Sequence, residues 1–313
     1  MSFFTLIVVF LLEQLQPLNY PRWVARPVRA WMAFWARRVD AGKYPQGVLG
    51  AVLTVFAPVL SLGVVYALFY RASVLLAFLL NVLALYLTLG FRQFSHFYTD
   101  IQLALRLGDV ARARALLAEW RSESVTADDT GELARMAIET ALTSAHRHVF
   151  AVLLWFVLLP GPLGAVLYRL SHLLCENWCA RGEFGRFARQ LFWVLDWLPA
   201  RVTAVVFAGM GNFVDALYCW RRYATRWYDP GLGIVIASGA GALGVRLGLG
   251  VPETAIWPGD ASRKDSNNGD SGTGEAADVE FMQSAVGLVW RAIVLWLLLL
   301  LLLGLARLAA YPS

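Results

Sequence analysis

The sequence has few charged residues for its length. Of 313 residues, only 16% are charged and 58% are hydrophobic, whereas soluble domains average about 25% and about 45–50%. So little charge cannot cover the surface of a water-soluble domain of this size. The composition therefore argues against an ordinary soluble globular protein and indicates a membrane protein.

Several common catalytic motifs and a full set of metal ligands are also missing. The chain has no G-x-x-x-x-G-K phosphate loop, no H-E-x-x-H zinc motif and no G-x-S-x-G nucleophile turn. It contains three cysteines, of which Cys175 and Cys179 would share a helix face with His172. They could be part of a metal site, but no fourth ligand is evident. We favour the other interpretation, small packing residues, and predict no metal.

Four runs with no charge or a single charge are long enough to cross a bilayer. They are residues 47–70, 72–91, 149–168 and 281–306, the last of which contains Arg291. A helix needs about 20 residues to cross about 30 Å of hydrocarbon. We therefore predict an all-α, polytopic helical membrane protein with four spans. Three further apolar segments, 3–12, 191–217 and 231–250, stay open as interfacial or membrane-embedded helices.

Basic residues predict the orientation of the chain. Residues 19–46 contain one acid, Asp40, and six basic residues: Arg22, Arg26, Arg29, Arg37, Arg38 and Lys43. By the positive-inside rule this segment is cytoplasmic, and its tryptophans suggest an amphipathic helix on the inner leaflet. We interpret the net charge of +5 as one that attracts the protein to the surface of the lipid bilayer. Nucleic acid is not an expected partner, since no recognition fold accompanies the charge; other membrane proteins stay open as partners.

The predicted spans divide the chain into six segments. These are an apolar N-terminal segment and basic amphipathic helix at 1–46, a two-span hairpin at 47–91, a cytoplasmic helical segment at 92–148, transmembrane and membrane-embedded segments at 149–250, a disordered acidic linker at 251–280 and a C-terminal transmembrane helix at 281–313. Within the cytoplasmic segment, Asp109 is a candidate helix cap, and Asp129-x-x-Glu132 has the spacing of a capping box.

Five stretches resemble one family in the same order along the chain. They are LRLGDVARARALLAEW at 105–120, DDTGELARMAIET at 128–140, VFAVLLWFVLLPGPLGAVLYR at 149–169, DWLPARVTAVVFA at 196–208 and GAGALGVRLG at 239–248. Together they resemble the CobD/CbiB family of cobalamin-biosynthesis membrane proteins. The N-terminal FFTLIVVFLLEQL and the D-W-L-P-x-R element also resemble AmpE, a related inner-membrane protein linked to β-lactamase induction. The resemblance implies a multi-pass protein of a bacterial inner membrane.

The resemblance implies chemistry only where the polar motifs are kept. Members of this family are implicated in ATP-dependent attachment of an aminopropanol arm to cobyric acid, which requires cations, a metal and carboxylates around an acyl phosphate. The R-D-T element of the family corresponds here to Asp128-Asp129-Thr130, and the pattern E-S-x-x-E-N-x-x-D-G begins at Glu139. The other motif positions hold different residues: Thr140, Thr143, Ser144, Arg147, His148, His172-Leu173-Leu174-Cys175, Phe192-Trp193 and Asp196.

These replacements decide between two functions. Phe, Cys or Arg cannot replace a carboxylate as a ligand for metal or phosphate. We therefore predict a divergent member that is not an active synthase, has a regulatory, sensing or accessory role and binds no cofactor. The alternative is an amide-forming ligase of cobalamin biosynthesis that uses ATP and Mg²⁺. A transporter would be favoured by an inverted repeat, and we see none.

A reduced polar site facing the cytoplasm remains a candidate under either function. Its members would be Asp129, Thr130, Glu139, Asp196 and Arg201. Purely structural roles stay open for them, with Asp129 as a helix cap, Glu139 as a solvated charge and Asp196 paired with Arg201. Two further residues, His146 and His148, suit either an ordinary interfacial position or proton transfer.

The orientation can be tested with reporter fusions. We expect a reporter fused after residue 45 and one fused after residue 120 to be cytoplasmic, because the basic segment anchors that side and two predicted spans separate the two positions. Alkaline phosphatase and fluorescent-protein activities in whole cells would measure this. A periplasmic signal at residue 120 would contradict the predicted orientation or number of spans.

Overall fold

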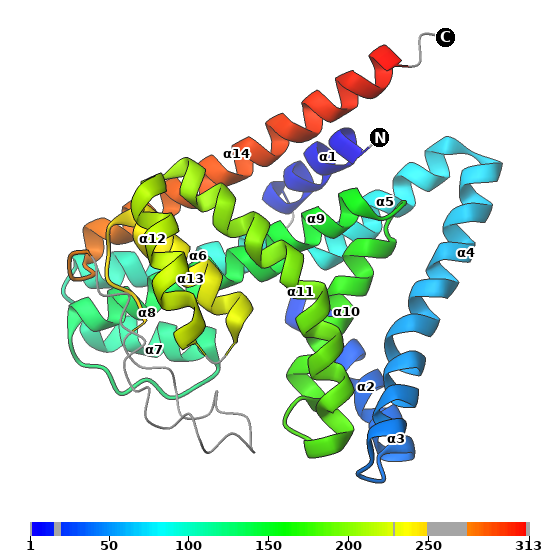
Figure 1. Cartoon of the computed structure of the whole chain (residues 1–313), viewed down its shortest axis with the longest axis horizontal. Coiled ribbons are helices and arrows are strands. Elements are labelled where there is room, and N and C mark those ends of the chain that lie inside the picture. Colours follow the sequence, from blue (N-terminus) through cyan, green and yellow to red (C-terminus); the bar gives the residue numbers. More distant parts are fainter. Residues whose placement is uncertain (1, 16–19, 228, 249–273, 311–313) are drawn as a thin grey trace. The chain divides into compact units, whose positions relative to one another are not determined.

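The computed structural model describes residues 2–15, 20–227, 229–248 and 274–310 (Figure 1). Nearly all of these residues are helical, and among them no strand forms, only an isolated bridge between Val245 and Glu275. The predicted all-α fold class is confirmed. The helices are α1 (Ser2–Leu15), α2 (Arg26–Val39), α3 (Tyr44–Ala51), α4 (Ala57–Ala72), α5 (Val74–Thr88), α6 (Phe91–Arg106), α7 (Val110–Arg121), α8 (Thr130–Ala145), α9 (Ala151–Leu158), α10 (Leu163–Trp178), α11 (Gly182–Met210), α12 (Phe213–Tyr223), α13 (Pro230–Leu243) and α14 (Val279–Ala310).

The chain forms two compact units, each built from segments that are distant in sequence. Unit 1 comprises Met1–Gly90, His148–Leu198 and Leu299–Ser313, and unit 2 comprises Phe91–Arg147 and Pro199–Leu298. This division differs from the six consecutive segments that the hydropathy pattern predicts.

Four helical stretches are long and apolar enough to cross a membrane. They are Tyr44–Ala72, Thr130–Leu158, Gly182–Met210 and Val279–Ala306. The first and last agree with the predicted spans 47–70 and 281–306. Gly182–Met210 includes much of 191–217, which the sequence left open. It contains Pro199, and proline is tolerated inside membrane helices where neighbouring groups satisfy the freed backbone carbonyl.

Two of the predicted spans do not correspond to a single long helix. The run 72–91 forms α5, which has 15 residues and a length of about 22 Å, less than the hydrocarbon thickness. The run 149–168 is not one helix, because α9 ends at Leu158 and α10 begins at Leu163. Between them lies Pro160-Gly161-Pro162, where Gly161 has a φ of 64° and proline cannot continue the helical hydrogen bonds.

The third long stretch begins earlier than predicted. Helix α8 starts at Thr130 and continues through a π-helical turn, His146–Phe150, into α9. Residues 130–148 are therefore continuous with α9, whereas the predicted segment 92–148 ends before the span; the cytoplasmic location of that segment stays a prediction. Leu133, Ile138 and Leu142 are among the apolar side chains of α8 that are buried within the protein.

The end of the predicted linker is also structured. Residues 251–273 of that linker lie outside the described residues, but Glu275 exchanges backbone hydrogen bonds with the 244–246 segment. The Arg246 N–H donates to the Glu275 carbonyl at 2.9 Å, and the Glu275 N–H donates to the Gly244 carbonyl at 3.0 Å. Helix α14 then begins at Val279. The segment 274–280 is therefore part of unit 2, because its backbone groups pair with those that follow α13.

Within unit 2, α6 packs beside α14. Tyr98 is buried, and its hydroxyl donates to the Met282 carbonyl at 2.8 Å. Burial raises the pKa of Tyr98, so the phenol stays protonated and keeps this hydrogen bond. The Gln102 amide donates to Gln283 one turn further along, at 3.3 Å.

Within unit 1, close packing depends on two glycines of α3. A Cβ atom at Gly47 would collide with the Phe184 carbonyl at the start of α11, and one at Gly50 would meet the Trp178 ring at 2.8 Å. Trp178 and Phe184 also pack on each other, with ring centroids 4.8 Å apart. Small residues are common where membrane helices approach this closely.

We predict that Gly47→Ala lowers the free energy of unfolding by about 1–3 kcal/mol, because the methyl group overpacks the contact with Phe184. Gly287→Ala in α14 is the matched control, since a Cβ there meets no atom within 4 Å and alanine favours a helix. Thermal unfolding of the purified chain in detergent would measure both. Equal stability of the two variants would contradict the predicted packing.

Candidate functional site

The five predicted site residues are divided between the two units. Asp129, Thr130, Glu139 and Arg201 belong to unit 2, and Asp196 belongs to unit 1. The polar contacts of unit 2 gather along α8, in positions that lie three or four residues apart and so share helix faces.

Glu139 is held in a buried network. Arg135 Nη1 donates to Glu139 Oε1 at 3.0 Å, and the Gly248 N–H donates to the same oxygen at 2.7 Å. The exposed fractions of the two side chains are 8% for Arg135 and 12% for Glu139. The interpretation of Glu139 as a solvated charge is therefore wrong. Its carboxylate connects α8 to the segment that follows α13.

Asp129 and Thr130 mark the start of α8. Asp129 Oδ2 accepts a hydrogen bond from the Glu132 N–H at 3.1 Å, and Thr130 is the first helical residue. The capping interpretation of Asp129 is confirmed. Its neighbour Asp128 forms an ion pair with Arg114, whose Nε donates to the Ala127 carbonyl at 2.8 Å. These contacts stabilise the entry to α8.

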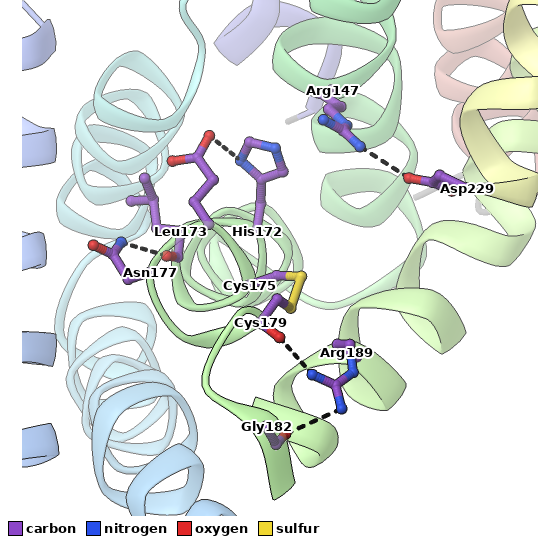
Figure 2. Close-up of a disulfide and its surroundings, with 10 residues drawn as sticks. Arg147, His172, Leu173, Cys175, Asn177, Cys179, Gly182, Arg189 and Asp229 are labelled. Atoms are coloured by element: carbon purple, nitrogen blue, oxygen red, sulfur yellow. Dashed lines mark hydrogen bonds and ion pairs between the residues drawn. A yellow bond between two sulfur atoms is a disulfide. The ribbon is translucent and has the colours of Figure 1, made fainter. Parts of the chain in front are cut away.

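Two contacts of the His146–Arg147 turn complete the polar network of unit 2. His146 Nδ1 lies 2.9 Å from Thr203 Oγ1 in a buried position on α11. Arg147 Nη2 donates to Asp229 Oδ2 at 3.0 Å (Figure 2). Asp229 Oδ1 accepts the N–H groups of Gly231 and Leu232. One carboxylate therefore caps α13 and binds an arginine of the long α8 stretch.

Sequence reasoning missed four members of this network: Arg135, Thr203, Asp229 and the Gly248 N–H. A signal existed for Asp229, because an aspartate followed by proline before an apolar run is typical of a helix start. The Gly248 contact has no such signal, since it joins residues 109 positions apart through a backbone group that any residue carries.

Asp196 has a partner within unit 1. Tyr168 donates its hydroxyl to Asp196 Oδ1 at 2.6 Å, and both side chains are buried. The pairing of Asp196 with Arg201 stays a prediction. Nearby in sequence, Arg169 Nε donates to the Tyr20 hydroxyl at 2.6 Å. Burial raises the pKa of Tyr20, and the Arg169 charge offsets part of that rise.

The cysteines form a bond that the sequence did not predict. A disulfide joins Cys175, in the last turn of α10, to Cys179, the residue that follows the helix, with their Cα atoms 4.8 Å apart (Figure 2). Both earlier interpretations, a metal site and simple packing, are therefore wrong for this pair. Arg189 donates to the Cys179 carbonyl and, at 3.1 Å, to the Gly182 carbonyl. His172 Nδ1 lies 3.6 Å from Glu176 Oε1.

The described residues of unit 2 do not fit a Mg²⁺ site of the kind that the family chemistry implies. Mg²⁺ is usually bound by one or two carboxylates together with substrate phosphates. Here Asp129 caps α8, Asp229 caps α13 and binds Arg147, and Glu139 is held by Arg135. In the part of the chain that the structure describes, no group of three or more His, Cys, Asp or Glu side chains could hold a metal.

A glycine pattern that was expected to be absent lies in α13. Residues 239–244 match G-x-G-x-x-G, the spacing of a dinucleotide-binding turn. In the structure Gly239 and Gly241 are inside the helix, and a Cβ atom at either would meet Leu142 or the Asp215 backbone. The pattern therefore serves close helix packing, since it neither follows a strand nor opens a helix.

Comparisons with known proteins agree with the family resemblance. The family model described as CobD/Cbib protein matches residues 6–252. A cobalamin biosynthesis protein CobD from Stutzerimonas stutzeri is 36% identical over 233 residues, which covers 73% of this chain and 74% of that protein. CobD from Chromobacterium violaceum is 36% identical over 226 residues, covering 71% and 70%. Cobalamin biosynthesis protein CbiB from Salmonella typhimurium is 25% identical over 306 residues, covering 91% of each. No solved structure matches.

These relatives carry CobD or CbiB names, and the closeness to AmpE stays a prediction. The residues described above, from Tyr20 to Gly248, all lie within the matched region.

We predict that Glu139→Ala strongly destabilises the chain, because Arg135 would lose its closest acidic partner while it stays buried. Breaking a buried pair in this way costs about 3–5 kcal/mol. Glu132→Ala is the matched control: it removes the same charge, from a side chain that is 49% exposed and 3.5 Å from Arg135, and should cost at most about 1 kcal/mol. Denaturant unfolding in detergent would measure both. Similar losses in the two variants would show that the pair is not buried.

Proposed function

Because the chain belongs to the CobD/CbiB family, we propose that it acts in cobalamin biosynthesis. The observation that carries this proposal is the 36% identity to a cobalamin biosynthesis protein CobD over 73% of the chain, together with a family match that extends over residues 6–252. The membrane is its site of action in this proposal. The four long apolar stretches support a multi-pass protein of the bacterial inner membrane, with the lipid bilayer as its surroundings.

The step that we propose is the ATP-dependent attachment of an aminopropanol arm to cobyric acid. This reaction joins an amine to a carboxylate, so the site must hold anionic groups of the acid and of ATP close to the amine. In unit 2, arginines are available for such contacts. Arg147 is the best candidate, because its side chain is partly exposed, at 25%, and already binds a carboxylate, that of Asp229.

In this proposal the buried and partly buried carboxylates of unit 2 hold arginines and backbone groups in place, and they do not bind a metal. Glu139 orients Arg135 and the Gly248 backbone, and Asp229 orients Arg147. Since these carboxylates do not fit a Mg²⁺ site, we assign no step to a metal held by them. Anion binding by arginine is compatible with the residues present, because the guanidinium group pairs with carboxylate and phosphate without a metal.

A second function is favoured by the replaced motif positions. Arg147 and His148 stand where the family pattern has an aspartate and a glycine, and Cys175, which replaces the last aspartate of N-T-L-D, forms a disulfide. A member that has lost these groups could keep the scaffold and serve as a regulatory, sensing or accessory protein. The two functions differ in whether the chain alone restores arm attachment.

Complementation would test the proposal. The gene is expressed in a bacterium that lacks its own arm-attaching synthase and whose growth requires cobalamin. We expect growth with supplied cobyric acid, and growth with arm-bearing cobinamide as the control for the later steps. If the protein accumulates in the membrane and cobinamide restores growth but cobyric acid does not, the synthase proposal is overturned and the accessory role takes its place.

A further inference from the structure

Helix α12 buries one apolar face within unit 2. Ala216, Cys219 and Tyr223 are the buried residues of this face. Cys219 and Tyr223 form a cluster with Ile234 and Ala237 of α13. Asn212 caps the helix by accepting the Asp215 N–H at 3.2 Å, and the Asn212 N–H donates to the Ala242 carbonyl at 3.1 Å. These contacts hold α12 against α13 (Figure 1) and leave the opposite face uncovered by described residues.

That opposite face is also apolar. Phe213, Val214, Leu217 and Tyr218 recur at helical spacing and are all exposed, Val214 to 74%. They line a shallow pocket of about 510 Å³. A helix that is apolar on two opposite sides does not suit a boundary with water, and a cluster of exposed apolar side chains indicates a binding surface.

Two arginines lie at the C-terminal end of the same face. Arg221 and Arg222 line the pocket beside the apolar residues, are exposed, and form no ion pair with any residue that the structure describes. The acid at the other end, Asp215, accepts a hydrogen bond from the Asn212 side chain at 2.6 Å. The face therefore changes from apolar to cationic along the helix axis, as the surface of an anionic phospholipid changes from acyl chain to phosphate.

The position of α12 in the chain places it at the end of a candidate span. Helix α11 ends at Met210, and α12 begins at Phe213 after a two-residue turn. With 11 residues, α12 is about 16 Å long and too short to cross the hydrocarbon. A short apolar helix beside a span, with arginines at one end, suits the boundary between acyl chains and headgroups.

We propose that this face of α12 is a binding site for an anionic phospholipid. The acyl chain lies along Phe213, Val214 and Leu217, and the phosphate is bound by Arg221 and Arg222. Arginine is suited to this role because its guanidinium group donates several hydrogen bonds to phosphate oxygens, and Tyr218 is of the residue type enriched at headgroup level. The proposal does not depend on the reaction that the chain catalyses.

Lipid competition would test the site. The full chain is placed in nanodiscs of phosphatidylcholine with a small fraction of phosphatidylglycerol, and lipids retained on the protein are counted by native mass spectrometry. We expect the wild type to retain phosphatidylglycerol in preference to phosphatidylcholine. In the double variant Arg221→Gln/Arg222→Gln, the ratio of retained phosphatidylglycerol to phosphatidylcholine should fall at least about fivefold. Each basic side chain near an anionic surface contributes about that factor to the affinity.

A matched variant separates a site from general charge attraction. Arg106→Gln/Arg112→Gln removes the same two charges from exposed positions on α6 and α7 and should leave the preference unchanged. An equal decrease in the two double variants would overturn the proposal, because it would mean that only net charge matters. Equal retention of the two lipids by the wild type would overturn it as well.

A photocrosslinker distinguishes a lipid from a second copy of the chain. With benzoylphenylalanine at Leu217, an exposed position, we expect covalent adducts with lipid, enriched in phosphatidylglycerol and lost in the arginine double variant. A crosslinked dimer as the main product would instead show that another copy covers this face, and would overturn the lipid assignment.

Discussion

Every backbone N–H and C=O group in a membrane-embedded stretch must find a partner within the protein, because the hydrocarbon offers none. This constraint governs the whole molecule. It explains why the described residues are nearly all helical, and why the helix ends that occur near apolar segments carry caps. Asp129, Asn212 and Asp229 each accept backbone N–H groups at the start of a helix. The polar side chains of unit 2 therefore perform two tasks at once, since Asp229 also binds Arg147.

The same constraint shows how much of the fold the sequence could predict. Long uncharged runs at 47–70 and 281–306 coincide with two of the long apolar helical stretches, because length and polarity decide whether a helix is able to cross a bilayer. They did not predict where a helix is interrupted. The run 149–168 is uncharged throughout, yet Pro160-Gly161-Pro162 ends one helix and another begins at Leu163. Conversely, the polar residues at the start of α8 concealed that this helix continues to Leu158.

The candidate site was predictable only where local sequence determines local structure. Asp129 was identifiable as a cap, since its partner lies three residues away. The environment of Glu139 was not, because it depends on Gly248, which is remote in sequence. Arg135 lies one turn from Glu139, but helical spacing does not reveal that the pair is buried. Asp196 likewise obtains its partner from another helix, in Tyr168.

Whether the disulfide of α10 forms in the cell depends on which side of the membrane its two cysteines face. Arg181, two residues after Cys179, lies 3.3 Å from Asp40, and Glu176 lies 3.4 Å from Arg29. The two sulfurs and the basic segment 19–46 therefore share one side of unit 1. If that segment is cytoplasmic, the sulfurs face a reducing compartment, where glutathione and thioredoxin keep thiols free. A bond that persists in freshly isolated cells would instead place the arginines on the oxidising side, so the thiol content of Cys175 and Cys179 reports the direction in which the chain is inserted.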